Sequence, residues 1–152
     1  EFFLQMNSIG DLFFNIFLIA LIPAIGEELF FRGIIQQKLK NILTPHLSVF
    51  ITSFIFSAIH FQFFGFLPRF FLGMILGYLF LYSRNLWTSI FAHFINNALG
   101  VLLMYSSFKD NLSFDVTKVP NIEVSPLLAS FSILVVFFFI YLYRKINMDK
   151  II

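Results

Sequence analysis

The chain has 152 residues, of which 59% are hydrophobic and only 12% are charged. A soluble domain carries about 25% charged residues, so the composition excludes an ordinary soluble domain and indicates a membrane protein, with a single domain over residues 1–152. The absence of cysteine excludes a thiol nucleophile, a thiolate metal site and a disulfide. The net charge of +2 comes from few charged residues and does not indicate a nucleic-acid partner.

Charged residues divide the chain into apolar blocks, which we compare with the roughly 20 residues that a helix needs to span a bilayer. The first predicted helix is longer than a simple span, starts at an Asn7–Ser8 cap and is expected to kink at Pro23. A polar segment, 109–125, separates the last two helices. The pattern predicts an all-α, polytopic membrane bundle with about five transmembrane helices, over residues 8–40, 45–62, 66–83, 86–108 and 126–143.

The basic residues predict how these helices are oriented. One face of the membrane carries six of them, Lys38, Lys40, Arg84, Arg144, Lys145 and Lys150. The opposite face carries three, Arg69, Lys109 and Lys118, together with three acidic residues. By the positive-inside rule the C-terminus is cytoplasmic and the polar segment is external. Richness in Phe, Ile, Asn and Lys is typical of an AT-rich bacterial genome, so we expect an integral protein of a bacterial inner (cytoplasmic) membrane.

The third predicted helix contains the spacing Gly73-x-x-x-Gly77. Two small residues four apart allow a second helix to approach closely. Such pairs are frequent in membrane helices, so we expect them to serve packing within this chain, with dimerisation as the alternative.

The strongly polar side chains inside the apolar blocks are few, namely Glu27, Glu28, Arg32, His60, His93, Asn96 and Asn97. Glu27 lies 13 residues before Lys40, a rise of about 20 Å along a helix. His60 lies 14 residues after His46, a rise of about 21 Å. His93 and Asn97 lie about 10 Å and about 16 Å past the start of the fourth helix. The spacing therefore predicts that these groups converge in one slab of the membrane, approached from the cytoplasmic side.

These residue types are the parts of a peptide hydrolase without a side-chain nucleophile. A carboxylate and a neutral imidazole can activate water, and two donors aimed at one point can stabilise an oxyanion. Glu28 and Arg32 are four apart and can pair, whereas Glu27 points about 100° away from Glu28 and lacks that partner. His93 and Asn97 are also four apart and share a helix face. No G-x-S-x-G or H-E-x-x-H occurs, but a Glu/His/His zinc site stays open.

Each of these residues also has a structural interpretation. The Glu28–Arg32 pair would then only lock two helices together, and a buried histidine is often a hydrogen-bonded packing residue. Two histidines at the level of the carboxylates favour catalysis over packing. Asn96 and Asn97 would join helices by hydrogen bonds, an interpretation that suits Asn96 better than Asn97.

Taken together and in chain order, the polar residues form three motifs, Glu27-Glu28-x-x-x-Arg32-Gly33, Phe56-x-x-x-His60 and His93-x-x-x-Asn97. They resemble the motifs of the CAAX protease and bacteriocin-processing family, also called the Abi or Rce1-like family, of intramembrane proteases. The resemblance covers residues 23–100 and leaves the helix at 126–143 as a C-terminal addition. Family members usually carry further helices before the first motif, so we expect upstream helices to be missing from this chain.

The resemblance implies a role for each motif residue. Glu27 would activate water with the help of His60, and His93 and Asn97 would stabilise the tetrahedral oxyanion. No cofactor is expected, although zinc is the alternative because a metal-dependent and a metal-free mechanism are both argued for this family. The residues that orient the site would be Glu28 and Arg32.

The sequence thus predicts an endopeptidase of the CAAX protease type that acts on a membrane-proximal peptide or protein in the lipid bilayer. The alternative is a non-catalytic membrane subunit that retains the family scaffold and binds a partner protein. Because every motif position is intact, the enzyme is the favoured interpretation.

Overall fold

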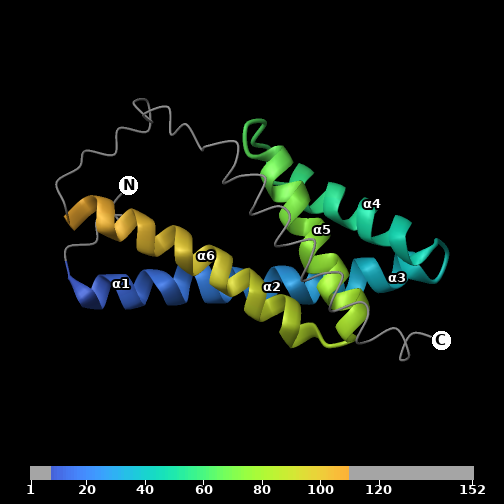
Figure 1. Cartoon of the computed structure of the whole chain (residues 1–152), viewed down its shortest axis with the longest axis horizontal. Helices are drawn as coiled ribbons and strands as arrows, with labels where there is room; N and C mark the ends of the chain where they lie inside the picture. Colours follow the sequence, from blue (N-terminus) through green and yellow to red (C-terminus); the bar gives the residue numbers. More distant parts are fainter. Residues whose placement is uncertain (1–7, 110–152) are drawn as a thin grey trace, which may run out of the picture.

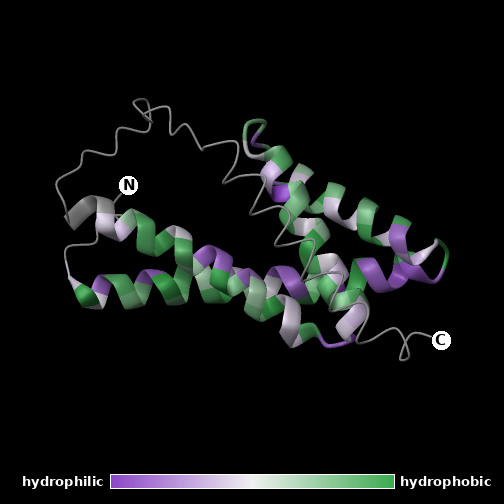
Figure 2. Ribbon diagram, viewed as in Figure 1, coloured by the Kyte–Doolittle hydropathy of each residue, from purple (hydrophilic) through white to green (hydrophobic). Residues whose placement is uncertain are grey.

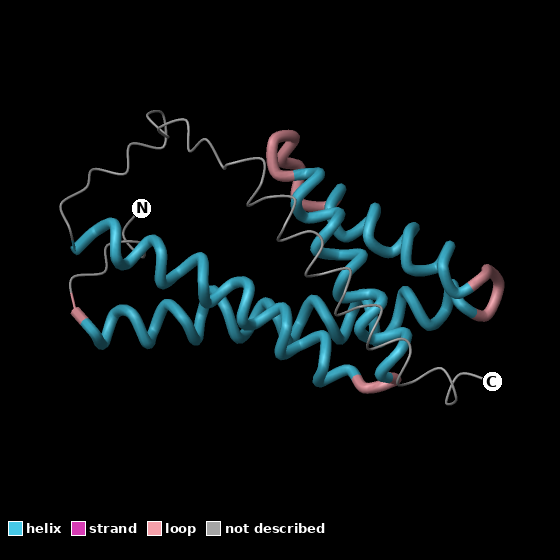
Figure 3. The backbone as a smooth tube through the Cα atoms, in the orientation of Figure 1, coloured by secondary structure: helices cyan, strands magenta, loops and turns pink. Residues whose placement is uncertain are grey.

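The computed structural model describes residues 8–109, which form helices joined by short loops (Figure 1, Figure 3). A long helix, Ile9–Lys40, comes first. It is followed by α4 (Pro45–Ala58), α5 (Phe66–Ser83) and α6 (Leu86–Lys109). The all-α prediction is therefore confirmed for this range, and the helix expected at 126–143 lies outside the described residues.

The long helix is continuous but not uniform. It comprises α1 (Ile9–Asn15), a π-helical stretch at 16–21, α2 (Ile22–Glu28), a second π-helical stretch at 29–36, and α3 (Gln37–Lys40). It starts as predicted at Ser8, whose hydroxyl accepts a hydrogen bond from the backbone N–H of Asp11 at 3.1 Å. Pro23 lies in the first turn of α2, directly after the π-helical stretch at 16–21, and its nitrogen carries no hydrogen to donate. The expected kink itself stays a prediction.

Three of the described helices are long and apolar enough to cross a membrane, Ile9–Lys40, Phe66–Ser83 and Leu86–Ser106. The prediction of about five spans is confirmed only to this extent. The apolar helix α4 has 14 residues and rises about 21 Å, less than the roughly 30 Å of the hydrocarbon core.

Helix α4 ends earlier than the sequence predicts, at Ala58 and not near Gln62. Phe61 adopts a left-handed backbone conformation with φ 51°, which a continuing α-helix does not allow. The carboxamide of Gln62 then accepts a hydrogen bond from the guanidinium of Arg69 at 2.5 Å, which ties the loop to α5. His60 therefore lies in a turn rather than on a helix.

Helices α4 and α5 pack as a close hairpin through two glycines of α5, Gly73 and Gly77. A Cβ atom on Gly73 would lie 3.1 Å from the Cβ of Ser53, and one on Gly77 would lie 2.9 Å from Cγ1 of Val49. Both glycines are buried inside the chain. Packing within this chain is thus confirmed, and this face of α5 is not free to dimerise.

The other helices arrange themselves around the long one. Helix α6 runs along α2 and the π-helical stretch before it, while the α4–α5 hairpin packs beside the second π-helical stretch (Figure 1). Most large apolar side chains point outward, and hydrophilic positions gather where the helices meet (Figure 2). Glu28 and Arg32 are fully buried, at 0% exposure each. The polar interior and the apolar exterior are what a membrane protein requires.

Candidate active site

A buried carboxylate, that of Glu28, joins the first motif to the third. Its Oε1 accepts a hydrogen bond from Nη1 of Arg32 at 2.7 Å and lies 2.8 Å from Nδ1 of His93. Because a carboxylate only accepts hydrogen bonds, Nδ1 of His93 is the donor. The opposite ring nitrogen, Nε2, is thereby turned toward Glu27 and lies 3.8 Å from its Oε2. The predicted Glu28–Arg32 pair forms, and it also orients His93.

The guanidinium of Arg32 reaches the other helices. Its Nη2 donates to the carbonyl oxygen of Gly73 on α5 at 3.0 Å. Its central carbon lies 4.8 Å from the ring centroid of Phe56 on α4, within the range of a cation–π contact. The same ring meets those of His60 and His93 edge-on, at 5.3 Å and 5.9 Å between centroids. The phenylalanine of the second motif thus packs between the buried cation and both imidazoles.

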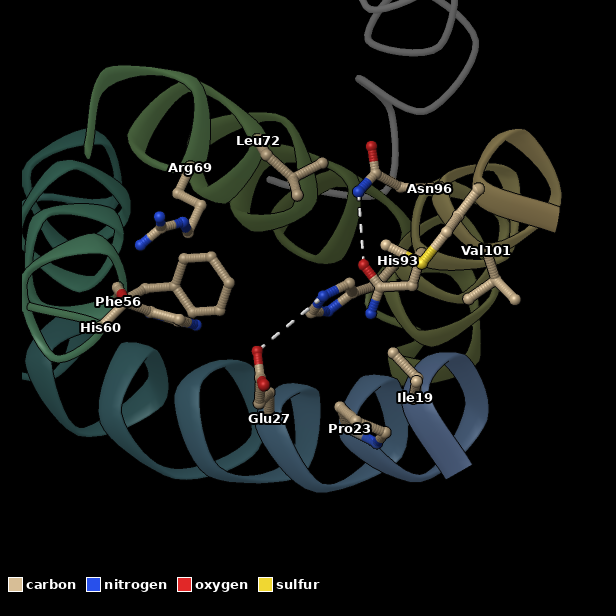
Figure 4. Close-up of a pocket in the computed structure, with 13 residues that line it drawn as sticks. Ile19, Pro23, Glu27, Phe56, His60, Arg69, Leu72, His93, Asn96 and Val101 are labelled. Carbon is tan, nitrogen blue, oxygen red and sulfur yellow. Dashed lines mark hydrogen bonds and ion pairs between the residues drawn. The ribbon is translucent and has the colours of Figure 1, made fainter. Parts of the chain in front are cut away.

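The predicted catalytic residues face one cavity of about 620 Å³ (Figure 4). Its polar lining includes Glu27, His60, His93 and Asn97, and its walls are mostly apolar. The predicted convergence of these four residues is therefore confirmed, although the side from which substrate approaches stays a prediction. Glu27 is about one third exposed, at 30%, whereas Glu28 lies behind it at 0%. Of the two carboxylates, Glu27 is the one that can meet a substrate.

His60 and Asn97 enter this cavity from opposite sides. Nδ1 of His60 lies 2.8 Å from the carbonyl oxygen of Phe56, and since a carbonyl only accepts, Nδ1 is the donor and Nε2 is left as an acceptor in the neutral ring. The side chain of Asn97 accepts a hydrogen bond from Asn96 at 3.3 Å and is not bonded to His93. Asn96 also lines the cavity, and because its bond to Asn97 lies within α6, its expected role in joining helices stays a prediction.

A family model described as Type II CAAX prenyl endopeptidase Rce1-like matches residues 9–99, which is more than half of the chain and includes all three motifs. The chain belongs to this family. None of the curated proteins and none of the solved structures matches it. As a member of the Rce1-like family with three helices that can cross a membrane, it is an integral membrane protein.

A zinc site, the alternative to a metal-free mechanism, would need the acidic and imidazole side chains of this Rce1-like protein as ligands. Within residues 8–109, no group of three or more His, Cys, Asp or Glu side chains is placed to hold a metal ion. His93 uses Nδ1 for Glu28, and His60 uses Nδ1 for the Phe56 carbonyl. Both bonds leave Nε2 of the ring free, so the Glu/His/His zinc site considered from the sequence stays an alternative.

Two further polar residues of this Rce1-like protein were not anticipated. Arg69 lines the same cavity, with its guanidinium folded into the space left by Gly65. From the sequence it served only as one of the basic residues that orient the chain. Gln36 is 2% exposed and donates to the carbonyl oxygen of Gly77 at 3.0 Å, one helical turn from the Arg32–Gly73 contact. Gln36 follows Glu28 by eight residues and Arg32 by four, so it shares their helix face, and this spacing could have revealed its buried position.

Proposed function

We propose that this protein is an intramembrane endopeptidase that hydrolyses a membrane-proximal peptide with water activated by Glu27. The observation that carries the proposal is the different placement of the two adjacent glutamates, Glu27 in the cavity and Glu28 buried behind it. Glu27 lines the cavity with both imidazoles and Asn97, whereas Glu28 is buried behind and holds His93. A general base in the cavity, with its partners fixed by a second carboxylate, is the arrangement that water activation requires.

In the proposed reaction, Glu27 takes a proton from water and the water oxygen attacks the carbonyl carbon of the scissile peptide bond. His60 offers its Nε2 to the same water. The tetrahedral oxyanion accepts a hydrogen bond from the amide of Asn97 and one from Nε2–H of His93, which in this step carries a proton on both ring nitrogens because Nδ1 donates to Glu28. Glu27 then gives its proton to the leaving nitrogen, and the C–N bond breaks to give an amine and a carboxylic acid.

The substrate that suits this cavity is a short apolar stretch of peptide. A volume of about 620 Å³ is within the range of sites that enclose small ligands. Apolar side chains from the first helix and from α6, among them Ile19, Pro23 and Val101, form its walls. We place the protein in a bacterial cytoplasmic membrane, with its C-terminus in the cytoplasm, where such a segment of another membrane protein can enter from the bilayer.

The proposal is tested by comparing the membrane proteomes of cells that carry the wild-type protein or the Glu27→Gln variant. Glutamine keeps the size and polarity of Glu27 but cannot take a proton. New peptide termini that appear with the wild type and vanish with Glu27→Gln identify the substrate. If the two proteomes agree and the protein purifies with a stoichiometric partner, it is instead a non-catalytic subunit.

Once a substrate is known, the two adjacent asparagines separate oxyanion stabilisation from simple lining of the cavity. Asn97→Ala should lower the turnover rate about a hundred- to a thousandfold, as expected for one lost oxyanion donor. Asn96→Ala serves as the matched control and should lose far less. Similar losses in both variants would contradict the role proposed for Asn97.

A further inference from the structure

A second cavity, of about 490 Å³, lies at the end of the long helix and shares no lining residue with the cavity at Glu27. It is enclosed by the last turns of that helix, by the end of α5 and by the start of α6, around the loop that joins these two helices (Figure 1, Figure 3). Its polar lining consists of Gln36, Gln37, Lys40, Asn41 and Arg84.

We take the cavity to lie near the boundary between hydrocarbon and lipid headgroups. The helices that are long and apolar enough to cross a membrane end at Lys40 and Ser83, and the third begins at Leu86, so one end of each lies beside the cavity. The remaining lining is apolar and includes Phe80 and Leu86. A molecule in this cavity would therefore have a polar group at the surface and apolar groups toward the bilayer.

Within residues 8–109, the charge of the cavity is positive and no acidic side chain lines it. Lys40 and Arg84 come from different helices, and the acidic residues within 8–109 are Asp11, Glu27 and Glu28. Glu28, the nearest of them along the chain, is paired with Arg32 and lies about 18 Å from Lys40 along the helix. The carboxyl ends of α3 and α5 contribute roughly half a negative charge each. The two full positive charges of Lys40 and Arg84 exceed the combined negative charge of these helix ends.

The fold constrains two of the polar residues around the cavity, the backbone of Arg84 and the side chain of Gln36. Arg84 has a left-handed backbone, with φ 53° and ψ 21°, a conformation uncommon outside glycine and asparagine. Gln36 is anchored by its bond to the Gly77 carbonyl, and its own side-chain oxygen is buried without a hydrogen-bond partner among the described residues. The site thus offers two cations for an anion, whereas the free Oε1 of Gln36 can only accept a hydrogen bond.

We propose that this cavity binds the phosphodiester head of an anionic membrane lipid. Lys40 and Arg84 neutralise the phosphate, the carboxamides of Gln37 and Asn41 donate hydrogen bonds to its oxygens, and the apolar wall receives the first carbons of the acyl chains. Basic pockets between helices at a membrane surface favour such headgroups. The site is separate from the proposed hydrolase, so either proposal can fail without the other.

The only tryptophan of the chain, Trp87, adjoins the cavity at the start of α6 and is well exposed, so it reports on bound lipid. The experiment titrates the full chain in neutral detergent with phosphatidylglycerol or phosphatidylcholine carrying brominated acyl chains, which quench its fluorescence. We expect phosphatidylglycerol to bind more tightly. Lys40→Gln and Arg84→Gln should each weaken its binding about fivefold.

Lys38→Gln is the matched control, because Lys38 is an exposed lysine of the same helix end that does not line the cavity. It should leave the affinity within about twofold of the wild type. Equal binding of the two lipids, or an equal loss in Lys38→Gln and Lys40→Gln, would overturn the proposal in favour of diffuse surface charge. Competition by inorganic phosphate identifies free phosphate as a ligand of the same site, and its failure to compete assigns the site to the lipid. Unchanged thermal unfolding of all three variants verifies that they are folded.

Discussion

Replacing Arg32 by methionine would remove the guanidinium that is bonded to Glu28, while keeping much of the side-chain volume. Arg32 and Glu28 are both 0% exposed, and their 2.7 Å contact has no water to replace it. Breaking a buried ion pair from one side costs about 3–5 kcal/mol, because a charge is left uncompensated. His93 still donates to the same carboxylate at 2.8 Å, so we expect Arg32→Met to lose stability near the lower end of that range.

The double variant Arg32→Met/Glu28→Gln tests whether the uncompensated charge causes this loss. With both charges removed, the remaining cost is that of lost hydrogen bonds, about 1–2 kcal/mol. The assay is unfolding of the full chain in mixed micelles, followed by circular dichroism, with the exposed Lys38→Met as a control expected to stay within about 0.5 kcal/mol of the wild type. If the double variant were no more stable than Arg32→Met, the charge argument would be refuted.

Three further predictions follow from the packing, the orientation and the site. Gly77→Ala should be less stable than Gly26→Ala by about 1–3 kcal/mol. A Cβ at Gly77 would lie 2.9 Å from Val49, whereas one at Gly26 would meet nothing within 4 Å. Comparing the unfolding of the two variants cancels the helix preference for alanine, which both share. In the cysteine-free chain, Asn111→Cys should react with an impermeant thiol reagent in intact cells and Asn147→Cys should not, and the opposite pattern would reverse the orientation. Activity should persist in excess chelator, whereas its complete loss, restored by zinc, would establish a metal mechanism.

Much of the fold follows from local signals that the sequence displays openly. The Ser8–Asp11 cap marks the start of the first helix, and the four-residue spacing of Glu28 and Arg32 predicts their pair. The end of α4 was hidden, because no charge interrupts the chain between Lys40 and Arg69 and the apolar run reads as helix up to Gln62.

The contact between Glu28 and His93 could not be predicted, because it depends on how two helices 65 residues apart rotate against each other. The sequence places both carboxylates at the depth of the imidazoles but does not say which of them a histidine meets. The π-helical stretches at 16–21 and 29–36 add to the difficulty, since a wider turn changes the direction of every later side chain relative to a regular α-helix. Arg69 likewise turns into the cavity only through a loop that the sequence does not define.

The shortness of α4 has a consequence for the bilayer itself. Its 14 residues leave the loop after it about 9 Å short of the far membrane surface, and this loop carries Phe61, Phe63 and Phe64 at 93%, 89% and 97% exposure. Irregular backbone at such depth needs water or protein around it. Thinning of the lipid leaflet beside His60 is one way for a bilayer to accommodate so short a helix, and the three phenyl rings would then lie among its acyl chains. Hydrolysis by this protein should accordingly respond to the thickness of the membrane that surrounds it.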